Sequence, residues 1–265
     1  MTSAVPSSFA YLPGADGSPV ILHVPHAARE IPAQVREGIV LGDAALERES
    51  DHIVDAHTDE IAGRAAEEAA VRPWRFVNLL SRLVVDPERF PDEREEMRAV
   101  GMGAVYTRTT HGGVLRNDTV DPEPLVRRYF HPYARAMTDA VAGRLAATGR
   151  AVVIDVHSYP SEPLPYELHG AGERPAVCLG TDAFHTPPAL LAAARDAFAG
   201  FGTGLDSPFS GTYVPLEYYG ADARVTALMI EVRRDVYMAE PGGAAGPGLD
   251  GVAAALAALV DAVSR

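Results

Sequence analysis

Three residues whose types suit metal binding and proton transfer each stand at the end of an apolar run. His26 and His157 follow two such runs, and Glu231 closes a third. Because the carboxyl ends of parallel strands meet at one edge of a sheet, we expect the three side chains to converge there. Two histidines with a carboxylate from another part of the chain, around an open fourth position, are typical of a catalytic zinc site, and Glu231 would be the proton-transfer group beside it. The sequence therefore predicts a hydrolytic metal site.

His157 has a carboxylate neighbour on its own side of the predicted strand. Side chains alternate along a strand, so Asp155 and His157 point the same way. A carboxylate beside a ligating histidine orients the ring by accepting its second N–H. The alternative is a buried Asp–His pair that only stabilises the fold. For His26 the alternative is an ordinary polar residue at a strand tip, and for His23, inside the strand, we expect a structural hydrogen bond.

Glu231 follows the apolar run 227–230, which has no polar face. Burial of a carboxylate there is costly unless the group is paired or bound to a metal. We expect Glu231 to act as a general base whose pKa is raised by partial burial. The alternative is a structural ion pair with Arg233, two residues further on.

The acidic metal ligand is expected from Glu49 or Asp51, close to the start of a helix. Asp51, Asp55 and Asp59 are spaced by four residues, which predicts that they share one helix face. The alternative for Asp55 and Asp59 is that both carboxylates are simply solvated.

The elements that position these residues can be predicted from the apolar pattern. Apolar runs alternate with amphipathic stretches, which favours βα units around a mostly parallel sheet. The predicted strands are 20–24, 74–79, 151–156, 176–179 and 225–232, and the predicted helical stretches are 43–70, about 122–148, one opened by Pro187 and Pro188, and 251–263. We expect a single α/β domain over residues 1–265, with a mostly parallel or mixed central sheet and helices on both faces.

The composition excludes several classes of protein. The chain has 265 residues, 47% of them hydrophobic, and a formal net charge of −13. Because that charge repels polyanions, neither nucleic acid nor an anionic membrane is an expected partner. The chain contains no lysine, which excludes Schiff-base and P-loop lysines. The Gly-x-Ser-x-Gly motif of serine hydrolases does not occur.

The cysteine content and the chain's apolar segments predict a location. Cys178 is the only cysteine, so no intramolecular disulfide can form, and a reducing compartment fits. The first residues carry neither a basic stretch nor an apolar run of signal-peptide length, and no apolar segment approaches a membrane span. We expect a cytoplasmic protein that is a monomer or a small homo-oligomer.

Six short stretches, in order along nearly the whole chain, resemble one protein family. They are Val24-Pro25-His26 with Ile31-Pro32, Glu49-Ser50-Asp51 with Asp55, Val77-Asn78 with Ser81-Arg82-Leu83-Val84-Val85-Asp86, Tyr129 with His131-Pro132-Tyr133, Asp155-Val156-His157-Ser158, and Ile230–Met238. In these stretches the chain resembles the N-formylglutamate amidohydrolases. The resemblance implies an α/β fold similar to zinc carboxypeptidases. It also implies hydrolysis of N-formyl-L-glutamate to formate and L-glutamate, a reaction of amino-acid degradation such as histidine catabolism.

The resemblance also implies which residues bind the metal. Zinc, or another divalent ion such as manganese, iron or nickel, would be held by His26, His157 and one of Glu49 and Asp51. Asp51 is the preferred acidic ligand, and Glu231 is the base.

Two departures from the family pattern bear on the substrate. The family usually has Ser-Gly after its first histidine, where this chain has Ala27-Ala28. Where a tryptophan often follows the aspartate, this chain has His52. Neither change removes an expected ligand.

A small anionic substrate with two carboxylates needs a local positive pocket in so acidic a protein. Arginines bind carboxylates in a bidentate way and suit this role. The candidate substrate-binding residues are Arg82, Arg89, Arg233 and Arg234, together with Asn78. Arg82 is preferred because it adjoins an apolar run, and it could also stabilise the oxyanion of the reaction. The alternative is that these arginines pair with acidic neighbours.

Two other functions fit the same residues. One is a related zinc amidase or carboxypeptidase-like hydrolase that acts on another N-acyl amino acid. The other is a non-catalytic protein that binds an acidic metabolite. A buried base at Glu231 argues against a mere binder.

Overall fold

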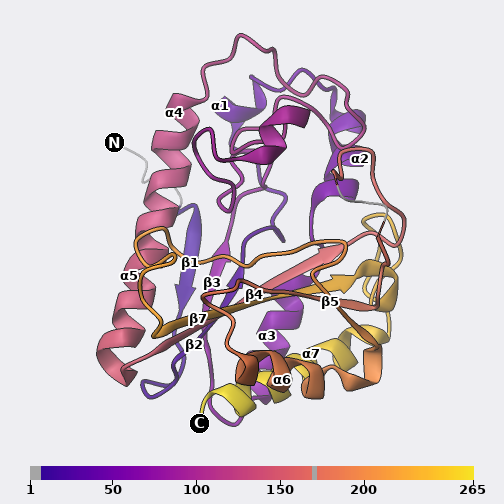
Figure 1. The fold of residues 1–265 in the computed structure, drawn as a ribbon. Coiled ribbons are helices and arrows are strands. Elements are labelled where there is room, and N and C mark those ends of the chain that lie inside the picture. The colour runs from indigo at the N-terminus through magenta and orange to yellow at the C-terminus, as the bar shows by residue number, and fades with distance from the viewer. Residues whose placement is uncertain (1–6, 169–171) are drawn as a thin grey trace.

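Residues 7–168 and 172–265, which the computed structural model describes, fold around a seven-stranded sheet in the order β1-β3-β2-β4-β7-β5-β6 (Figure 1). The strands are β1 (Phe9–Leu12), β2 (Val20–Val24), β3 (Trp74–Asn78), β4 (Ala151–Tyr159), β5 (Val177–Gly180), β6 (Thr203–Leu205) and β7 (Val225–Arg233). The five predicted strands are confirmed. The edge strands β1 and β6 were not predicted, because three or four residues are too few to show an alternating pattern.

The four central strands set the direction of the site. Strands β3, β2, β4 and β7 are parallel, whereas β1 and β5 run antiparallel beside them. The register pairs His23 with Asp155 and His157 with Glu231. Because paired positions of parallel strands share a face, these four side chains project from one face near the carboxyl ends of their strands.

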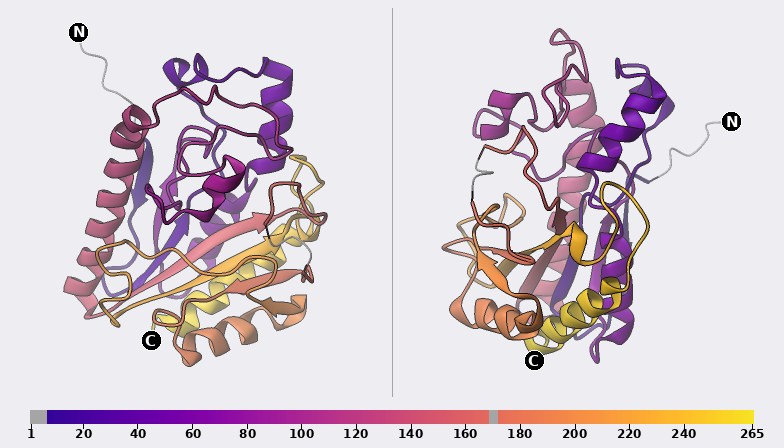
Figure 2. Two further views of the ribbon diagram at one scale, coloured as in Figure 1. Left: turned by 45° about the horizontal axis from the view of Figure 1, so that its top comes forward. Right: turned by 90° about the vertical axis from the view of Figure 1, so that its right-hand side faces the viewer.

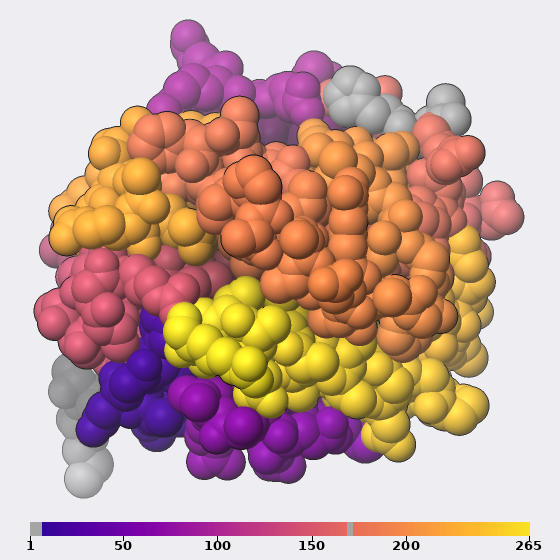
Figure 3. All heavy atoms as spheres, turned by 60° about the horizontal axis from the view of Figure 1, so that its bottom comes forward, coloured from indigo at the N-terminus to yellow at the C-terminus, as the bar shows by residue number. Residues whose placement is uncertain are grey.

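Helices cover both faces of the sheet, as the sequence predicts. They are α1 (Ala33–Arg36), α2 (Asp43–Ile53), α3 (Thr58–Glu68), α4 (Glu123–Leu125), α5 (His131–Thr148), α6 (Pro188–Ala197) and α7 (Gly248–Val263), with 3-10 helices η1 (Glu96–Val100), η3 (Ala199–Phe201) and η4 (Arg234–Val236) and a π-helix η2 (Val126–Phe130). Helices α3, α6 and α7 pack on one face, and α5 packs on the other. In Figure 3 the yellow α7 lies between orange and purple segments that include α6 and α3.

The apolar sequence of the central strands explains why they are buried. Every residue of β4 is buried, as expected for a run rich in β-branched residues between two layers of helices. Helix α7 places Val252, Leu256 and Val260 in the same apolar cluster as Val152 and Ile154 of β4. No helix of residues 7–168 and 172–265 has the length and the apolar composition needed to cross a membrane.

The prediction of one helical stretch over 43–70 is wrong, because the chain turns between α2 and α3. Helix α2 ends at Ile53, because Val54 is extended, and His57 takes a left-handed φ of 67° just before α3 begins. The main-chain N–H of Asp55 donates to the carbonyl of His26 at 3.0 Å instead of continuing the helix. Asp51 and Asp55 therefore do not share a helix face.

A long segment, 79–122, covers the carboxyl edge of the sheet beside α2 (Figure 2). It contains one short helix, η1, and is held from inside by Arg116. This buried side chain donates to the carbonyl of Tyr106 at 2.7 Å and to that of Leu83. Apolar residues of the segment, among them Leu83, pack against Ile53 at the end of α2. The segment thereby forms one wall over the strand ends.

Candidate active site

The structure brings His26 and His157 together at the carboxyl edge of the sheet. His26 lies on the loop that leaves β2, and His157 lies in β4. Their Nδ1 atoms are 3.3 Å apart, and both residues are buried. Two ring nitrogens this close, in the interior, point to a shared partner.

Asp55, in the turn between α2 and α3, completes a group of three ligand atoms. Its Oδ2 lies 3.1 Å from Nδ1 of His157 and 3.6 Å from Nδ1 of His26. Donors about 2.1 Å from a tetrahedral zinc ion lie at similar distances from one another. Burial opposes ionisation of Asp55, but its hydrogen bonds with His157 and His26 outweigh burial and lower its pKa. Two imidazole nitrogens and a carboxylate oxygen thus fit a divalent cation.

Further carboxylates hold the outer edges of the two rings. Asp86 Oδ1 lies 2.9 Å from Nε2 of His26, and Asp155 Oδ1 lies 3.1 Å from Nε2 of His157. Carboxylates in this position fix the orientation of metal-binding rings. Asp155 also bonds to His23 at 2.8 Å, so His23 has the structural role expected of it.

Glu88, which the sequence analysis did not single out, lies on the Nε2 side of the same rings. Its Oε2 is 3.2 Å from Nε2 of His157 and 3.6 Å from Nε2 of His26. His26, Glu88 and His157 therefore form a second group that could hold an ion, and so do His23, Glu88 and Asp155. Nothing in the spacing of the loop 86–89 indicated this contact, because no regular element fixes where its side chains point.

Glu231 lies beside His157 across the β4–β7 pair. The residue is 8% exposed, and its Oε2 is buried without a hydrogen-bond partner. Burial raises its pKa to about 8. Arg233, the expected structural partner, instead binds Asp235 at 2.7 Å. Glu231 is thus an unpaired carboxyl group at the site, which is what a proton-transfer role requires.

Neither Glu49 nor Asp51 lies beside the histidine rings. Both carboxylate oxygens of Glu49 accept hydrogen bonds from Thr110, at 2.7 and 2.9 Å. Asp51 binds Arg29 at 2.7 Å. Both residues belong to α2, whereas the carboxylate that reaches the rings, Asp55, lies in the turn after it. The sequence analysis named Asp55 but treated it as a solvated residue of a helix.

Two of the candidate arginines have their donors occupied by the protein. Arg82 donates to Asp86 at 2.7 Å, to Tyr106 at 3.0 Å and to a main-chain carbonyl at 3.4 Å. Arg234 donates to Asp55 at 3.2 Å and to the carbonyl of His52 at 2.6 Å. These arginines brace the carboxylates around the histidines.

The other candidate substrate-binding residues, Arg89, Asn78 and Arg233, differ in their hydrogen-bond partners. Arg89 lies with its Nε buried and without a hydrogen-bond partner, 3.5 Å from Asp86. Asn78 donates to the carbonyl of Pro25 at 2.9 Å and so holds the loop that carries His26. Arg233 is tied to Asp235, as described above. Among the candidates, Arg89 is the side chain with a buried donor left for a ligand.

A cavity of about 550 Å³ is lined by His26, Asp55, Glu88, Arg89, His157 and Glu231 among others. Among residues 7–168 and 172–265, seven buried side-chain nitrogen or oxygen atoms lack a hydrogen-bond partner. Five of them belong to residues that line this cavity: Glu88, Arg89, His157, Thr212 and Glu231. Because buried polar groups are normally paired, their concentration in one cavity marks it as a binding site.

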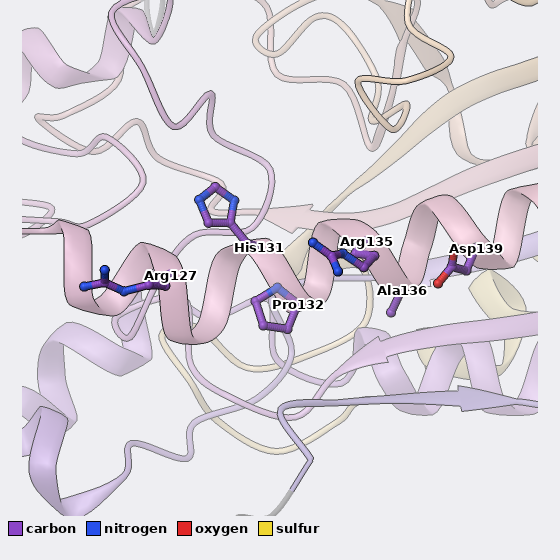
Figure 4. A pocket seen from close by; sticks show the side chains of 6 residues that line it. All are labelled: Arg127, His131, Pro132, Arg135, Ala136 and Asp139. Carbon is purple, nitrogen blue, oxygen red and sulfur yellow. The ribbon is translucent and has the colours of Figure 1, made fainter.

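A second hollow lies along the helical stretch of η2 and α5 (Figure 4). The side chains that line it come from residues 127–139 alone, and its charged residues are all exposed. It lacks the buried acids and bases of the cavity at the strand ends, so the chemistry belongs to that cavity.

Known proteins resemble this chain in sequence and in fold. The sequence model of a family described as N-formylglutamate amidohydrolase matches residues 18–238. An N-formylglutamate amidohydrolase from Ralstonia eutropha JMP134 is 22% identical, with 97% of each chain covered and a TM-score of 0.79. A gene product from Agrobacterium tumefaciens is 18% identical, with 97% of this chain and 93% of that chain covered and a TM-score of 0.66. At these identities the two structures establish the fold. None of the curated proteins matches the chain significantly.

Proposed function

This chain belongs to the N-formylglutamate amidohydrolase family, and on that premise we propose that it hydrolyses the amide bond of an N-formyl amino acid, with N-formyl-L-glutamate as the first candidate. The observation that carries the proposal is the triangle of His26, His157 and Asp55, with edges of 3.1 to 3.6 Å, beside the unpaired carboxyl group of Glu231.

We propose that a divalent cation, zinc in the first place, is held by His26, His157 and Asp55. With Nδ1 of each ring free for the ion, Nε2–H of His26 can donate to Asp86, and Nε2 of His157 faces the carboxylates of Asp155 and Glu88 at 3.1 and 3.2 Å. A bound ion of this kind lowers the pKa of water and polarises a carbonyl group. The carboxylate of Asp55 balances part of its charge.

Glu231 is proposed to transfer the proton of the reaction. As the oxygen of water adds to the formyl carbon, Glu231 accepts a proton from it. The same proton then goes to the amide nitrogen as the C–N bond breaks, leaving formate and the free amino acid. Burial raises the pKa of Glu231 to about 8, which suits a group that must both take and return a proton near neutral pH.

Arg89 is proposed to bind a carboxylate of the substrate. Its buried, unpaired Nε lies in the cavity wall, three residues from Asp86. Arg82 would act differently, since its contact with Asp86 fixes the carboxylate that orients His26. A role for Arg82 in stabilising the oxyanion stays a prediction.

A related substrate is the second candidate. The cavity of about 550 Å³ falls within the range of roughly 300–1,000 Å³ that is usual for drug-sized ligands. An acyl group larger than formyl therefore fits by size, and another N-acyl amino acid could be hydrolysed by the same groups.

Metal analysis combined with product assays tests the proposal. We expect purified protein to contain about one divalent ion and to release formate from N-formyl-L-glutamate. Removal of the ion by a chelator should abolish the release, and zinc should restore it. Release of acetate from N-acetyl-L-glutamate at a higher rate would favour the second candidate. Tight binding without turnover in metal-replete protein would show a binding protein instead.

A further inference from the structure

One acidic side chain of the cavity has no role in the proposed reaction. Glu88 lies on the loop after β3, lines the cavity, and its side chain is 16% exposed. Its Oε1 is buried without a hydrogen-bond partner. Asp55, Asp86 and Asp155 each have hydrogen-bond partners in the protein, so Glu88 shares its unsatisfied oxygen with Glu231, the proposed base, and with none of these three.

The groups nearest to Glu88 are already engaged. Nδ1 of His23, 3.5 Å from Oε1, bonds to Asp155 at 2.8 Å. Nε2 of His26, 3.6 Å from Oε2, bonds to Asp86 at 2.9 Å. His157 Nε2, 3.2 Å from Oε2, lies equally close to Asp155 at 3.1 Å. At least one oxygen of Glu88 is therefore left to accept a hydrogen bond from a bound molecule.

The charges around the cavity limit how many carboxylates a ligand can bring. Arg82 and Arg234 are bonded to Asp86 and Asp55 within the protein. The next residue after Glu88, Arg89, keeps a buried unpaired donor. Arg94 and Arg135 also line the cavity but are exposed. Its inner part thus offers the guanidinium group of Arg89 to a ligand carboxylate and, beside it, the carboxylate of Glu88, which would repel a second one.

We infer that Glu88 sets the specificity of this site by accepting a hydrogen bond from the substrate, so that N-formyl amino acids with a neutral, donor-bearing side chain are preferred to those with a second carboxylate. The inference rests on the proposed hydrolysis of N-formyl amino acids at the same site, and it places N-formyl-L-glutamate, the first candidate above, behind a compound with a neutral side chain. Arg89 binds the single carboxylate, and Glu88 receives an N–H group such as that of a side-chain amide.

Two substrates of nearly equal shape test the inference. N-formyl-L-glutamine and N-formyl-L-glutamate differ by a terminal NH₂ in place of a charged oxygen. We expect kcat/KM of the unchanged protein to favour the glutamine compound by about tenfold or more, since one good hydrogen bond or one repulsive charge changes affinity by that order. Glu88→Gln should reduce this preference by about tenfold, with metal content unchanged.

Glu217→Gln is the matched control. Glu217 lines the same cavity but is exposed at its rim, so this change removes the same charge away from the histidines. The substrate preference should remain that of the unchanged protein. Equal shifts in the two variants would show a general charge effect and overturn the role of Glu88. A preference of the unchanged protein for the glutamate compound would overturn it as well.

Two further readouts separate this inference from its premises. Loss of the metal in Glu88→Gln would show that Glu88 is a ligand, with His26 and His157, and would end its role in specificity. If neither compound is hydrolysed, the proposed function fails, yet calorimetric titration of both compounds still measures the preference. Tighter binding of the glutamine compound, lost in Glu88→Gln, would then support the inference alone.

Discussion

Two arginine–carboxylate groups lie within eight residues of each other and differ in how far their hydrogen bonds are satisfied. Arg82 and Asp86 form a buried pair whose polar atoms also reach Tyr106 and His26. Glu88 and Arg89 are largely buried too, but each keeps an atom without a partner. Arg82 and Asp86, whose hydrogen bonds are satisfied, thus hold the histidines in place. Glu88 and Arg89 each keep an atom that can bind a ligand.

The largest effect is expected at Glu231, the other carboxyl group of the cavity with a buried oxygen that lacks a hydrogen-bond partner. Glu231→Gln should lower kcat by about 10³-fold, because an amide cannot carry the proton and such groups contribute roughly 10²–10⁴. Formate release measures the rate, and elemental analysis should show the metal retained. A variant as fast as the unchanged protein would remove Glu231 from proton transfer.

The second test concerns the acidic ligand. Asp55→Asn should lower metal affinity by more than about 100-fold, since loss of a group that merely orients a ligand already costs 10–100-fold. Asp51→Asn should bind metal as the unchanged protein does, because Asp51 contacts Arg29 instead of the histidines. Competition with a chromogenic chelator measures both affinities. If Asp51→Asn lost metal affinity and Asp55→Asn kept it, the acidic ligand would be Asp51 of α2, as the sequence predicts.

Substitutions of Arg82 and of Arg89 should differ in their effects on stability and on KM. Arg82→Ala should destabilise the protein by about 3–5 kcal/mol, because it takes from the buried Asp86 the guanidinium group that donates to it at 2.7 Å. Arg89→Ala should change stability by about 1 kcal/mol or less and raise KM by about tenfold. Urea unfolding and steady-state kinetics give the two numbers. Equal stability losses would show that Arg89 is as structural as Arg82.

The smallest effect is expected from pH. A base must be ionised, and burial raises the pKa of Glu231 to about 8, so kcat/KM should increase as pH rises toward that value. A cation bound nearby favours the ionised form, which moves the midpoint of the metal-loaded enzyme below that of metal-free protein. Rates between pH 5 and 9 measure the midpoint. A profile without an acid limb contradicts the assignment.

Patterns in the sequence predict the strands and the two histidines, because both depend on local features. The buried runs of β2, β4 and β7 are long and apolar, and His26 and His157 stand at their ends. The edge strands lacked such a signal. The central sheet could therefore be placed from the sequence before its edges.

The carboxylates could not be placed in the same way. A spacing of four residues put Asp51 and Asp55 on one helix, but α2 ends at Ile53, and the main-chain N–H of Asp55 donates to the carbonyl of His26, far away in the sequence. The loop that carries Glu88 shows no periodic pattern of apolar residues from which the direction of its side chains could be predicted. Likewise, no pattern in the sequence shows that the donors of Arg82 are bonded within the protein, since Tyr106, one of the acceptors, is 24 residues away.

The hydrogen bond from the main-chain N–H of Asp55 to the carbonyl of His26 has a consequence for metal uptake. It joins the backbones that carry two of the three proposed ligands, so their separation is set when the chain folds and not when an ion arrives. Little conformational entropy is then lost on coordination. Apo and loaded protein should accordingly share one backbone arrangement, and the ion can exchange without the surrounding chain having to refold.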